Sequence, residues 1–148
     1  MTPDNRQKRV LLAEPNNELR ALYGDHLRSE GYEVVYAASC DEAVEALAKG
    51  PPFTAVCINE EIPGGGAIDL LHRARQVDGQ SPYLVLGAGL DFGGTTVEMY
   101  RSGAAKCLEI NATGLAALVE TVKSLDGDPA ATLLTRLGLP RLKREIGT

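Results

Sequence analysis

Two histidines and three cysteines are the residues of this chain whose side chains most often act as catalytic bases, nucleophiles or metal ligands. His26 and His72 fall in segments with helical periodicity, and neither has a carboxylate and a nucleophile spaced to form a catalytic triad. Cys40, Cys57 and Cys107 are widely separated without a C-x-x-C pair, which favours reduced structural thiols over a zinc site or a disulfide framework. A redox role is the alternative for the thiols. The pattern predicts packed or surface histidines and no enzyme.

Two glycine-rich stretches, 64–66 and 87–93, are the candidates for loops that hold a phosphate group. The first lacks the Lys-Ser/Thr pair of a P-loop, and the second has its third glycine one residue too late for the dinucleotide fingerprint. Nucleotide or flavin binding is therefore an alternative without a matching motif. Glu60 and Glu61 are adjacent, so they point in different directions and are typical of a solvated acidic loop; a role as metal ligand or phosphoryl acceptor is the alternative.

Charge and composition restrict the class of partner. The chain has 148 residues, a formal net charge of -5 and a pI near 5.0, so one acidic domain is expected, with no attraction to nucleic acid or to anionic membranes. The polar N-terminus lacks the apolar segment of a signal peptide, and no run of about 18 apolar residues is present. These observations predict a cytoplasmic protein.

Five short apolar segments alternate with five helical ones and should position these side chains. The strands are expected at 9–13, 32–37, 53–58, 83–86 and 106–110. The helices are expected at 17–30, 39–49, 97–102 and 115–125, and a further one after the loop at 59–66 with Ile68, Leu71 and Ala74 facing inward. This alternation predicts a doubly wound α/β fold with a parallel sheet, whose ligands collect at the carboxyl ends of the strands.

Periodicity and capping residues give details of the first helices. The first has Asn16 or Asn17 as its N-cap and Gly31 at its end. Its apolar residues recur with the helical period and are Leu19, Leu22, Tyr23 and Leu27. Ser39 is the expected N-cap of the second helix, which should end at Gly50.

The two ends of the chain differ from its centre. Residues 1–8 are polar and expected to be disordered, and residues 126–148 are expected to form a linker and a helical tail. Leu133, Leu134 and Leu137 would lie on one face of that tail. Packing of the tail on its own domain and docking to a partner or a second copy are both open.

Five short motifs, in order and with matching spacing, give this chain a resemblance to a known family. They are RVLLAEPNNELR at 9–20, EGYEVV at 30–35, DEAV at 41–44, IPG at 62–64 and RSGAA at 101–105. Together they resemble the receiver domain of two-component response regulators over residues 9–125. The resemblance implies a flavodoxin-like (βα)5 domain with strand order 2-1-3-4-5 and a place in signal transduction.

Receiver domains accept a phosphoryl group on an aspartate at the end of the third strand, with Mg²⁺ held partly by acidic residues after the first. By the resemblance, the acceptor position falls on Asn59, whose carboxamide cannot form an acyl phosphate. The acidic positions fall on Glu14 and Pro15, which leaves one carboxylate. Metal binding is therefore expected to be absent, or weak at Glu14.

The remaining positions of the family's site are also altered. By the same resemblance the hydroxyl position falls on Gly87, the lysine position on Ile110 and the aromatic switch position on Cys107. Glu109 has the wrong charge for phosphate, and Lys106 lies four residues too early to replace the lysine. A kept framework with altered chemical positions is typical of a degenerate, or pseudo-receiver, domain.

The resulting hypothesis is a pseudo-receiver that binds a protein partner without phosphorylation and without a cofactor. The partner would be a signalling component or the protein's own output domain, and a homodimer is a further option. By resemblance, the residues expected on the partner face are Tyr100, Arg101, Cys107 and Leu115. A nucleotide- or flavin-binding protein and an atypical receiver that still binds metal or phosphate are the alternatives.

Overall fold

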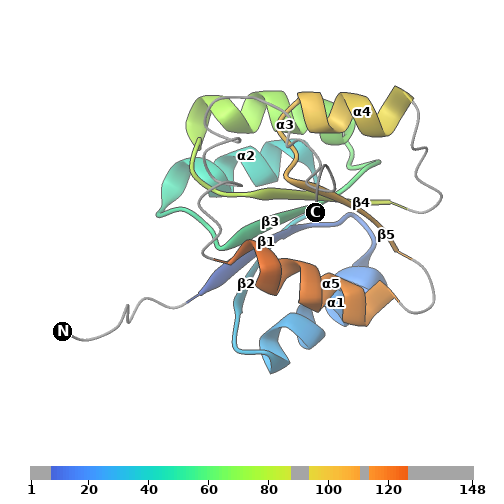
Figure 1. The fold of residues 1–148 in the computed structure, drawn as a ribbon. Coiled ribbons are helices and arrows are strands. Elements are labelled where there is room, and N and C mark those ends of the chain that lie inside the picture. The colour runs from blue at the N-terminus through green and yellow to red at the C-terminus, as the bar shows by residue number, and fades with distance from the viewer. Residues whose placement is uncertain (1–7, 88–93, 111–113, 127–148) are drawn as a thin grey trace, which may run out of the picture.

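The computed structural model describes residues 8–87, 94–110 and 114–126, and for Gly94 and Thr95 the backbone only. Its centre is a five-stranded parallel sheet with the order β2-β1-β3-β4-β5, as expected (Figure 1). The strands are β1 (Arg9–Ala13), β2 (Glu33–Ala37), β3 (Ala55–Asn59), β4 (Tyr83–Gly87) and β5 (Lys106–Glu109). They depart from the sequence-based ranges by one or two residues, the usual uncertainty of element ends.

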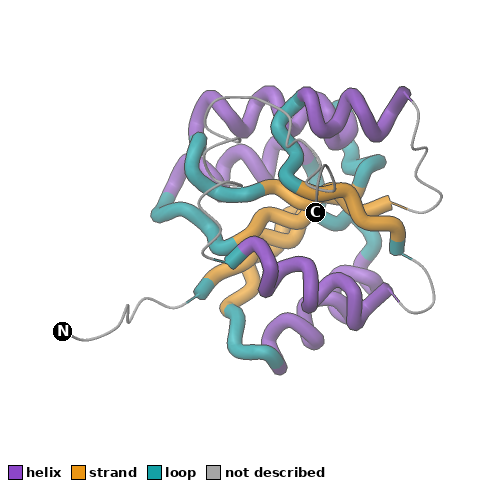
Figure 2. The backbone as a smooth tube through the Cα atoms, in the orientation of Figure 1, coloured by secondary structure: helices purple, strands orange, loops and turns teal. Residues whose placement is uncertain are grey.

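Helices cover both faces of the sheet, as expected for a doubly wound fold. One face carries α2 (Cys40–Lys49), α3 (Gly66–Val77) and α4 (Gly94–Arg101), and the other carries α1 (Asn17–Ser29) and α5 (Gly114–Leu125) (Figure 1). Figure 2 shows the same three layers, with the orange strands between purple helices. Each helical layer closes its own hydrophobic core against the sheet.

The burial of the strands follows their place in the sheet. The central strands β1, β3 and β4 are buried over nearly their whole length, which explains their continuous apolar sequences. The edge strands β2 and β5 are largely half-buried or exposed, although β2 has the apolar centre Val34-Val35-Tyr36. The two edges of the sheet thus differ in composition.

Side-chain caps fix the starts of the first two helices where the sequence predicts them. The Asn16 carboxamide accepts a hydrogen bond from the Leu19 amide, and the Ser39 hydroxyl accepts one from Glu42. The Glu42 carboxylate in turn accepts from the Ala38 amide at 2.8 Å. Gly31, with a φ of 97°, follows the end of α1.

The apolar face of α1 differs from the prediction at one residue. Tyr23 and Leu27 are buried, but Leu22 is 51% exposed. The cause is Gly24, which is itself buried beneath Tyr36 of β2: a Cβ at Gly24 would lie 2.3 Å from the Tyr36 hydroxyl oxygen. Successive helical residues are about 100° apart, so a face that includes Gly24 turns Leu22 away from the sheet.

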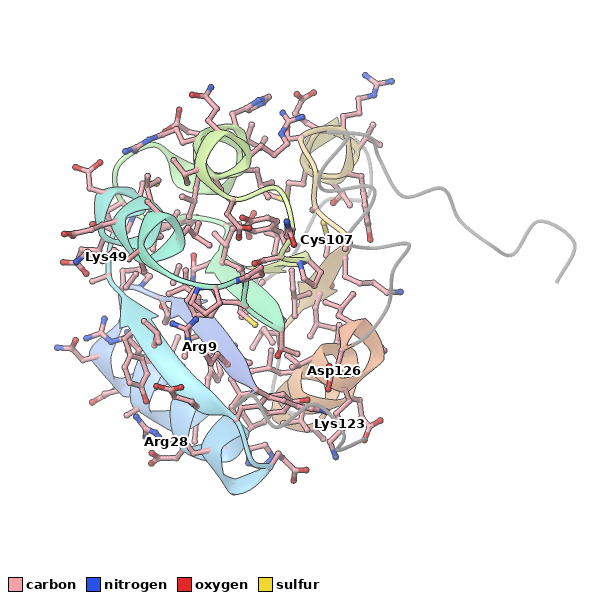
Figure 3. All side chains as sticks on the ribbon, turned by 90° about the vertical axis from the view of Figure 1, so that its left-hand side faces the viewer. Arg9, Arg28, Lys49, Cys107, Lys123 and Asp126 are labelled. Atoms are coloured by element: carbon pink, nitrogen blue, oxygen red, sulfur yellow. The ribbon has the colours of Figure 1, made fainter. Side chains whose placement is uncertain are left out.

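The first and last described residues lie side by side. Lys8 Nζ and Asp126 Oδ2 form an ion pair at 2.6 Å, and Lys123 binds Glu30 of the α1 end at 2.8 Å (Figure 3 labels Lys123 and Asp126). Residues 1–7 and the predicted tail at 127–148, with Leu133, Leu134 and Leu137, lie outside the described residues. Among the helices that the structure describes, none is long and apolar enough to cross a membrane.

Candidate functional site

The carboxyl ends of β1 and β3 bring together two of the predicted site residues, Glu14 and Asn59. Glu14 directly follows β1, and its amide donates to the carbonyl of Ala37 at 2.9 Å. Asn59 is the last residue of β3. Because neighbouring parallel strands end at the same edge of the sheet, residues separated by 45 positions become direct neighbours here.

Glu14 is buried, with 1% of its surface exposed. Its Oε1 accepts a hydrogen bond from Asn59 Nδ2 at 2.9 Å, and its Oε2 accepts one from the Asn16 amide at 3.0 Å. The buried carboxylate also contributes, after burial itself, to raising the pKa of Tyr23. Both oxygens of Glu14 therefore have neutral donors from the protein as partners.

The Asn59 carboxamide uses its donor and its acceptor at once. Nδ2 donates to Glu14, and Oδ1 accepts from the Glu61 amide at 2.7 Å. A carboxylate at this position would accept the second bond but could not donate the first. The carboxamide thus joins the end of β1 to the loop after β3, at the residue for which the resemblance predicts the phosphoacceptor position.

Arg20 is a neighbour of this pair to which the sequence analysis gave no role. Its Nη1 donates to the carbonyl oxygen of Glu14 at 2.8 Å, and its Nη2 donates to Asn17 Oδ1. The guanidinium therefore holds the backbone between β1 and α1 and leaves the Glu14 carboxylate to Asn59 and Asn16. The Asn17-x-x-Arg20 spacing, about one helical turn, was a signal for the contact between these two side chains but not for the bond to the Glu14 carbonyl.

The predicted hydroxyl and lysine positions are brought together by the backbone. The Ile110 amide donates to the Gly87 carbonyl at 2.8 Å, so the two residues are neighbours beyond β4 and β5. The Ile110 side chain is half-buried, and a Cβ at Gly114 would lie 3.3 Å from it. Lys106 is exposed and pairs with Leu84 at the opposite end of β5, away from Ile110.

The loop after β3 is defined by backbone bonds and three glycines. Gly64, Gly65 and Gly66 have φ values of 98°, 136° and 82°, a conformation that favours glycine at each position. The Pro63 carbonyl accepts from the Cys40 amide at 2.8 Å. Within residues 8–87, 94–110 and 114–126, no group of three acidic, histidine or cysteine side chains is placed to hold a metal ion.

Comparison with known proteins places this arrangement in a known fold. No family model matches the chain. The transcriptional regulatory protein YkoG of Bacillus subtilis is 28% identical over an alignment 93 positions long, which covers 57% of this chain and 40% of that protein. A CheY-like response regulator receiver domain protein of Methanospirillum hungatei superposes with a TM-score of 0.74 and 20% identity, over 82% of this chain and 96% of that one.

The chain has the fold of a response-regulator receiver domain. Chemotaxis protein CheY4 of Vibrio cholerae agrees, with a TM-score of 0.73 and 20% identity, over 81% of this chain and 99% of that one. The order and number of strands, the five helices and the structural neighbours confirm the predicted fold class. The chain spans less than half of the length of the curated relative that it matches.

The predicted partner face of this receiver fold contains a contact that the sequence did not reveal. The hydroxyl oxygen of Tyr100 on α4 accepts a hydrogen bond from the Cys107 amide of β5 at 3.1 Å. Burial raises the pKa of the Cys107 thiol to about 11, and its Sγ lies 4.0 Å from Met99 Sδ. A ring from α4 is thus hydrogen-bonded at the residue for which the sequence analysis predicts the aromatic switch position.

The other two residues of that face have different environments. Arg101 is exposed at the end of α4. Leu115 on α5 packs against the core on the opposite side of the sheet from Cys107. The structure therefore joins Tyr100, Arg101 and Cys107 on the α4 side of β5 and places Leu115 on the other.

His72 has a serine neighbour, but their geometry argues against a catalytic pair. His72 Nε2 lies 3.2 Å from the Ser102 hydroxyl, and His72 Nδ1 lies 3.0 Å from an Arg75 guanidinium nitrogen. Because a guanidinium only donates, Nδ1 is the acceptor and the ring proton lies on Nε2, facing Ser102. In this tautomer His72 cannot remove a proton from Ser102. His26, on α1, is half-buried.

Proposed function

We propose that this chain is a receiver-type signalling module that acts by binding a protein partner and does not accept a phosphoryl group. The observation that carries the proposal is the hydrogen bond between Asn59 Nδ2 and Glu14 Oε1. It fills the position of the phosphoacceptor with a group that is not nucleophilic. The receiver fold, and the likeness to a transcriptional regulatory protein, support a role in two-component signalling.

Phosphoryl transfer depends on positioning and charge neutralisation, and the altered residues supply neither. Pro15 brings no metal ligand beside Glu14, whose oxygens already have protein donors. Gly87 has no side-chain hydroxyl, and Ile110 has no charge to pair with phosphate. Together with Asn59 these make four changes that act in the same direction, so reversing one alone would not restore the reaction.

The partner would meet the α4 side of β5, where Arg101 is exposed and Tyr100 is tied to the strand. A receiver switches partners by moving the elements of this region, whereas the bond to the Cys107 amide favours one arrangement. We therefore infer constitutive binding, to a signalling protein or to an output domain of the same protein.

The phosphorylation claim is tested by incubating the protein with acetyl phosphate, or with a phosphohistidine donor, in the presence of Mg²⁺. The intact mass is expected to stay unchanged while a working receiver, treated in parallel, gains a phosphoryl group. A gain of one phosphoryl group by this chain would overturn the proposal. The single variant Asn59→Asp should also remain unlabelled, because Pro15, Gly87 and Ile110 are unchanged.

The binding claim is tested by affinity capture from the native host with wild-type protein and two charge-reversal variants. Arg101→Glu is expected to lose the captured partner. Asp25→Lys, at an exposed position of α1 on the other face of the sheet, is the matched control and should retain it. Equal capture by both variants would exclude the α4 side of β5 as the partner site.

A further inference from the structure

The two edge strands of the sheet differ in how their outer sides are protected. An edge strand exposes unpaired backbone groups, which can pair with a strand of another chain unless charges or covering groups prevent it. β5 has only four residues, begins with exposed Lys106 and ends with exposed Glu109, and its Cys107 amide is bound to the Tyr100 hydroxyl. β5 is therefore a protected edge.

The centre of β2 has no charged residue of its own, and the neighbouring charge is the Arg28 guanidinium of α1, which lies 5.2 Å from the centroid of the Tyr36 ring. Val34, Val35 and Tyr36 are half-buried, and all three are residues with high strand propensity. Charge is confined to Glu33 at the start of the strand, and no proline interrupts it. β2 is thus an apolar edge strand of five residues, long enough to pair with another strand.

Backbone hydrogen bonds define which groups of β2 point outward. The Glu33 amide donates to the Lys8 carbonyl at 2.8 Å, and the Ala37 carbonyl accepts from the Glu14 amide at 2.9 Å. Both residues therefore direct their main-chain groups toward β1. Since this direction alternates along a parallel strand, Val34 and Tyr36 direct their amides and carbonyls away from the sheet.

A groove between β2 and α2 runs along the same edge and has charges of opposite sign at its ends. Arg9 and Lys49 line its part near the start of β2, and Glu42 lies toward the end of the strand. Each cation also has a surface ion pair within its own chain, Arg9 with Glu33 at 3.7 Å and Lys49 with Glu45 at 3.2 Å, and exposed pairs of this kind are weak. Figure 3 faces this region, with Arg9 and Lys49 labelled. If a second copy lies alongside with its groove running in the opposite direction, the acidic end of each groove faces the basic end of the other.

We propose that two copies of this chain associate through their β2 strands, antiparallel, with Val35 at the twofold axis. In this register Val34 of one copy lies opposite Tyr36 of the other, and the outward amides and carbonyls of the two residues bind each other. A tyrosine and a valine face each other on each side of the axis, a favourable cross-strand pair. The two sheets become continuous across the dimer.

Charge complementarity selects a second copy as the occupant. Antiparallel pairing brings the Glu42 end of one groove beside the Arg9 and Lys49 end of the other, and the symmetry repeats this match on both sides. In a parallel arrangement, each end of one groove would face the end with the same charge in the other copy. The interface is separate from the α4 side of β5, so its failure would leave the proposed function untouched.

The test is sedimentation equilibrium of the full chain, with Val34→Pro as the variant and Val34→Thr as its control. Proline removes an outward amide and breaks no bond to β1, and Glu33 before it is already extended. We expect a dimer for wild type and Val34→Thr, and for Val34→Pro a dissociation constant roughly tenfold to a hundredfold higher. Circular dichroism of Val34→Pro at the same concentration establishes that it is folded.

A second pair of variants tests the charge match independently of the backbone. Lys49→Glu should weaken the dimer, and Glu42→Lys/Lys49→Glu, which reverses both members of the match between the two copies, should recover part of the loss. The wild-type chain is measured at concentrations that rise in 100-fold steps to the highest soluble one. If it stays monomeric at all of them, the proposal is overturned. A dimer that all four variants leave unchanged would also overturn it.

Discussion

Two buried carboxylates lie at opposite ends of this sheet and have similar partners. Glu14, at the carboxyl end, accepts from the Asn59 carboxamide and the Asn16 amide. Asp78, at the amino end, is 9% exposed and accepts from the Tyr83 hydroxyl at 3.1 Å and from the Gln80 amide at 3.0 Å. Neither carboxylate has an ion pair among those found in the described part of the chain.

The similarity indicates what kind of site Glu14 belongs to. Asp78 closes the turn between α3 and β4, at the other end of the sheet from Glu14, and its hydrogen bonds hold that turn to Tyr83 and Gln80. A metal site would leave carboxylate oxygens directed at a shared point, with water or the cation as their partner. The Glu14 oxygens are instead satisfied by the protein, as those of Asp78 are. Around Glu14, the carboxyl end of the sheet therefore has the hydrogen-bond pattern of a structural junction.

The largest expected effect on stability is at Asp78, at the amino end of the sheet. Asp78→Ala leaves the Tyr83 hydroxyl and the Gln80 amide without their acceptor, so we expect a loss of about 3 kcal/mol in the free energy of unfolding. Urea unfolding measures it, and Asp25→Ala, at an exposed carboxylate, should change stability by less than about 0.5 kcal/mol. If the two variants are equally stable, the hydrogen bonds of Asp78 do not stabilise the fold, and Asp78 cannot serve as the structural carboxylate with which Glu14 is compared.

Asn59→Asp tests the comparison directly, because it replaces the donor to Glu14 with a second carboxylate. We expect a loss of about 2 kcal/mol at pH 7. Two close carboxylates raise the pKa of one of them above its unfolded value, so the folded variant binds the extra proton more tightly. The loss should therefore be small at acidic pH and grow as the pH rises, in urea titrations from pH 4 to pH 8.

The same variant distinguishes a junction from a latent metal site. Mg²⁺ or Ca²⁺ should raise the melting temperature of Asn59→Asp and leave that of wild type unchanged, because only the variant has paired carboxylates without a donor between them. A wild-type protein that is stabilised by millimolar Mg²⁺ would show that Glu14 does bind metal, and the likeness to Asp78 would fail.

A smaller effect is expected at β5, where a neutral hydroxyl satisfies an edge amide. Tyr100→Phe keeps the ring and removes the acceptor of the Cys107 amide. We expect a loss of about 1 kcal/mol and faster hydrogen exchange at Cys107, measured by NMR. Unchanged exchange at that amide would show that the bond does not hold α4 to the strand.

The smallest effect concerns the thiols. Burial keeps them neutral, whereas the two buried carboxylates have hydrogen-bond partners. Burial raises the pKa of Cys57 to about 12 and that of Cys107 to about 11, above the ordinary value of 9.0. The folded state therefore retains protons that the unfolded state releases, and stability should fall as the pH rises from about 9 toward 11. Cys57→Ala should reduce this slope in urea titrations, and an unchanged slope would contradict the assignment.

Much of the fold was predictable because local signals and burial agree along the chain. The Asn16 and Ser39 caps, the apolar central strands and the alternation of strand and helix each predict the structure that is found. The prediction was wrong where a distant residue changes a helix face: Leu22 is exposed because Tyr36, on another element, takes the space above Gly24. Such contacts have no signature in a local window.

For the candidate site, the sequence predicted which residues lie there but not which backbone atoms they contact. The resemblance placed Asn59 and Glu14 at one edge, and the structure brings them into contact. The bonds of Arg20 to the Glu14 carbonyl and of Tyr100 to the Cys107 amide were not predictable, since both depend on main-chain atoms of other elements. Side chains can be assigned to positions from spacing, but their backbone partners require the fold. The partner face itself stays a prediction.

The close approach of Gly24 and Tyr36 has a consequence for the relatives of this chain. A Cβ at residue 24 would lie 2.3 Å from the tyrosine oxygen, so the Tyr36 ring would have to move to admit any side chain larger than hydrogen. The two positions should covary: homologues with alanine or larger at 24 should carry a small residue at 36. An alignment would thus identify which homologues share the contact between α1 and Tyr36 of β2, before any of them is purified.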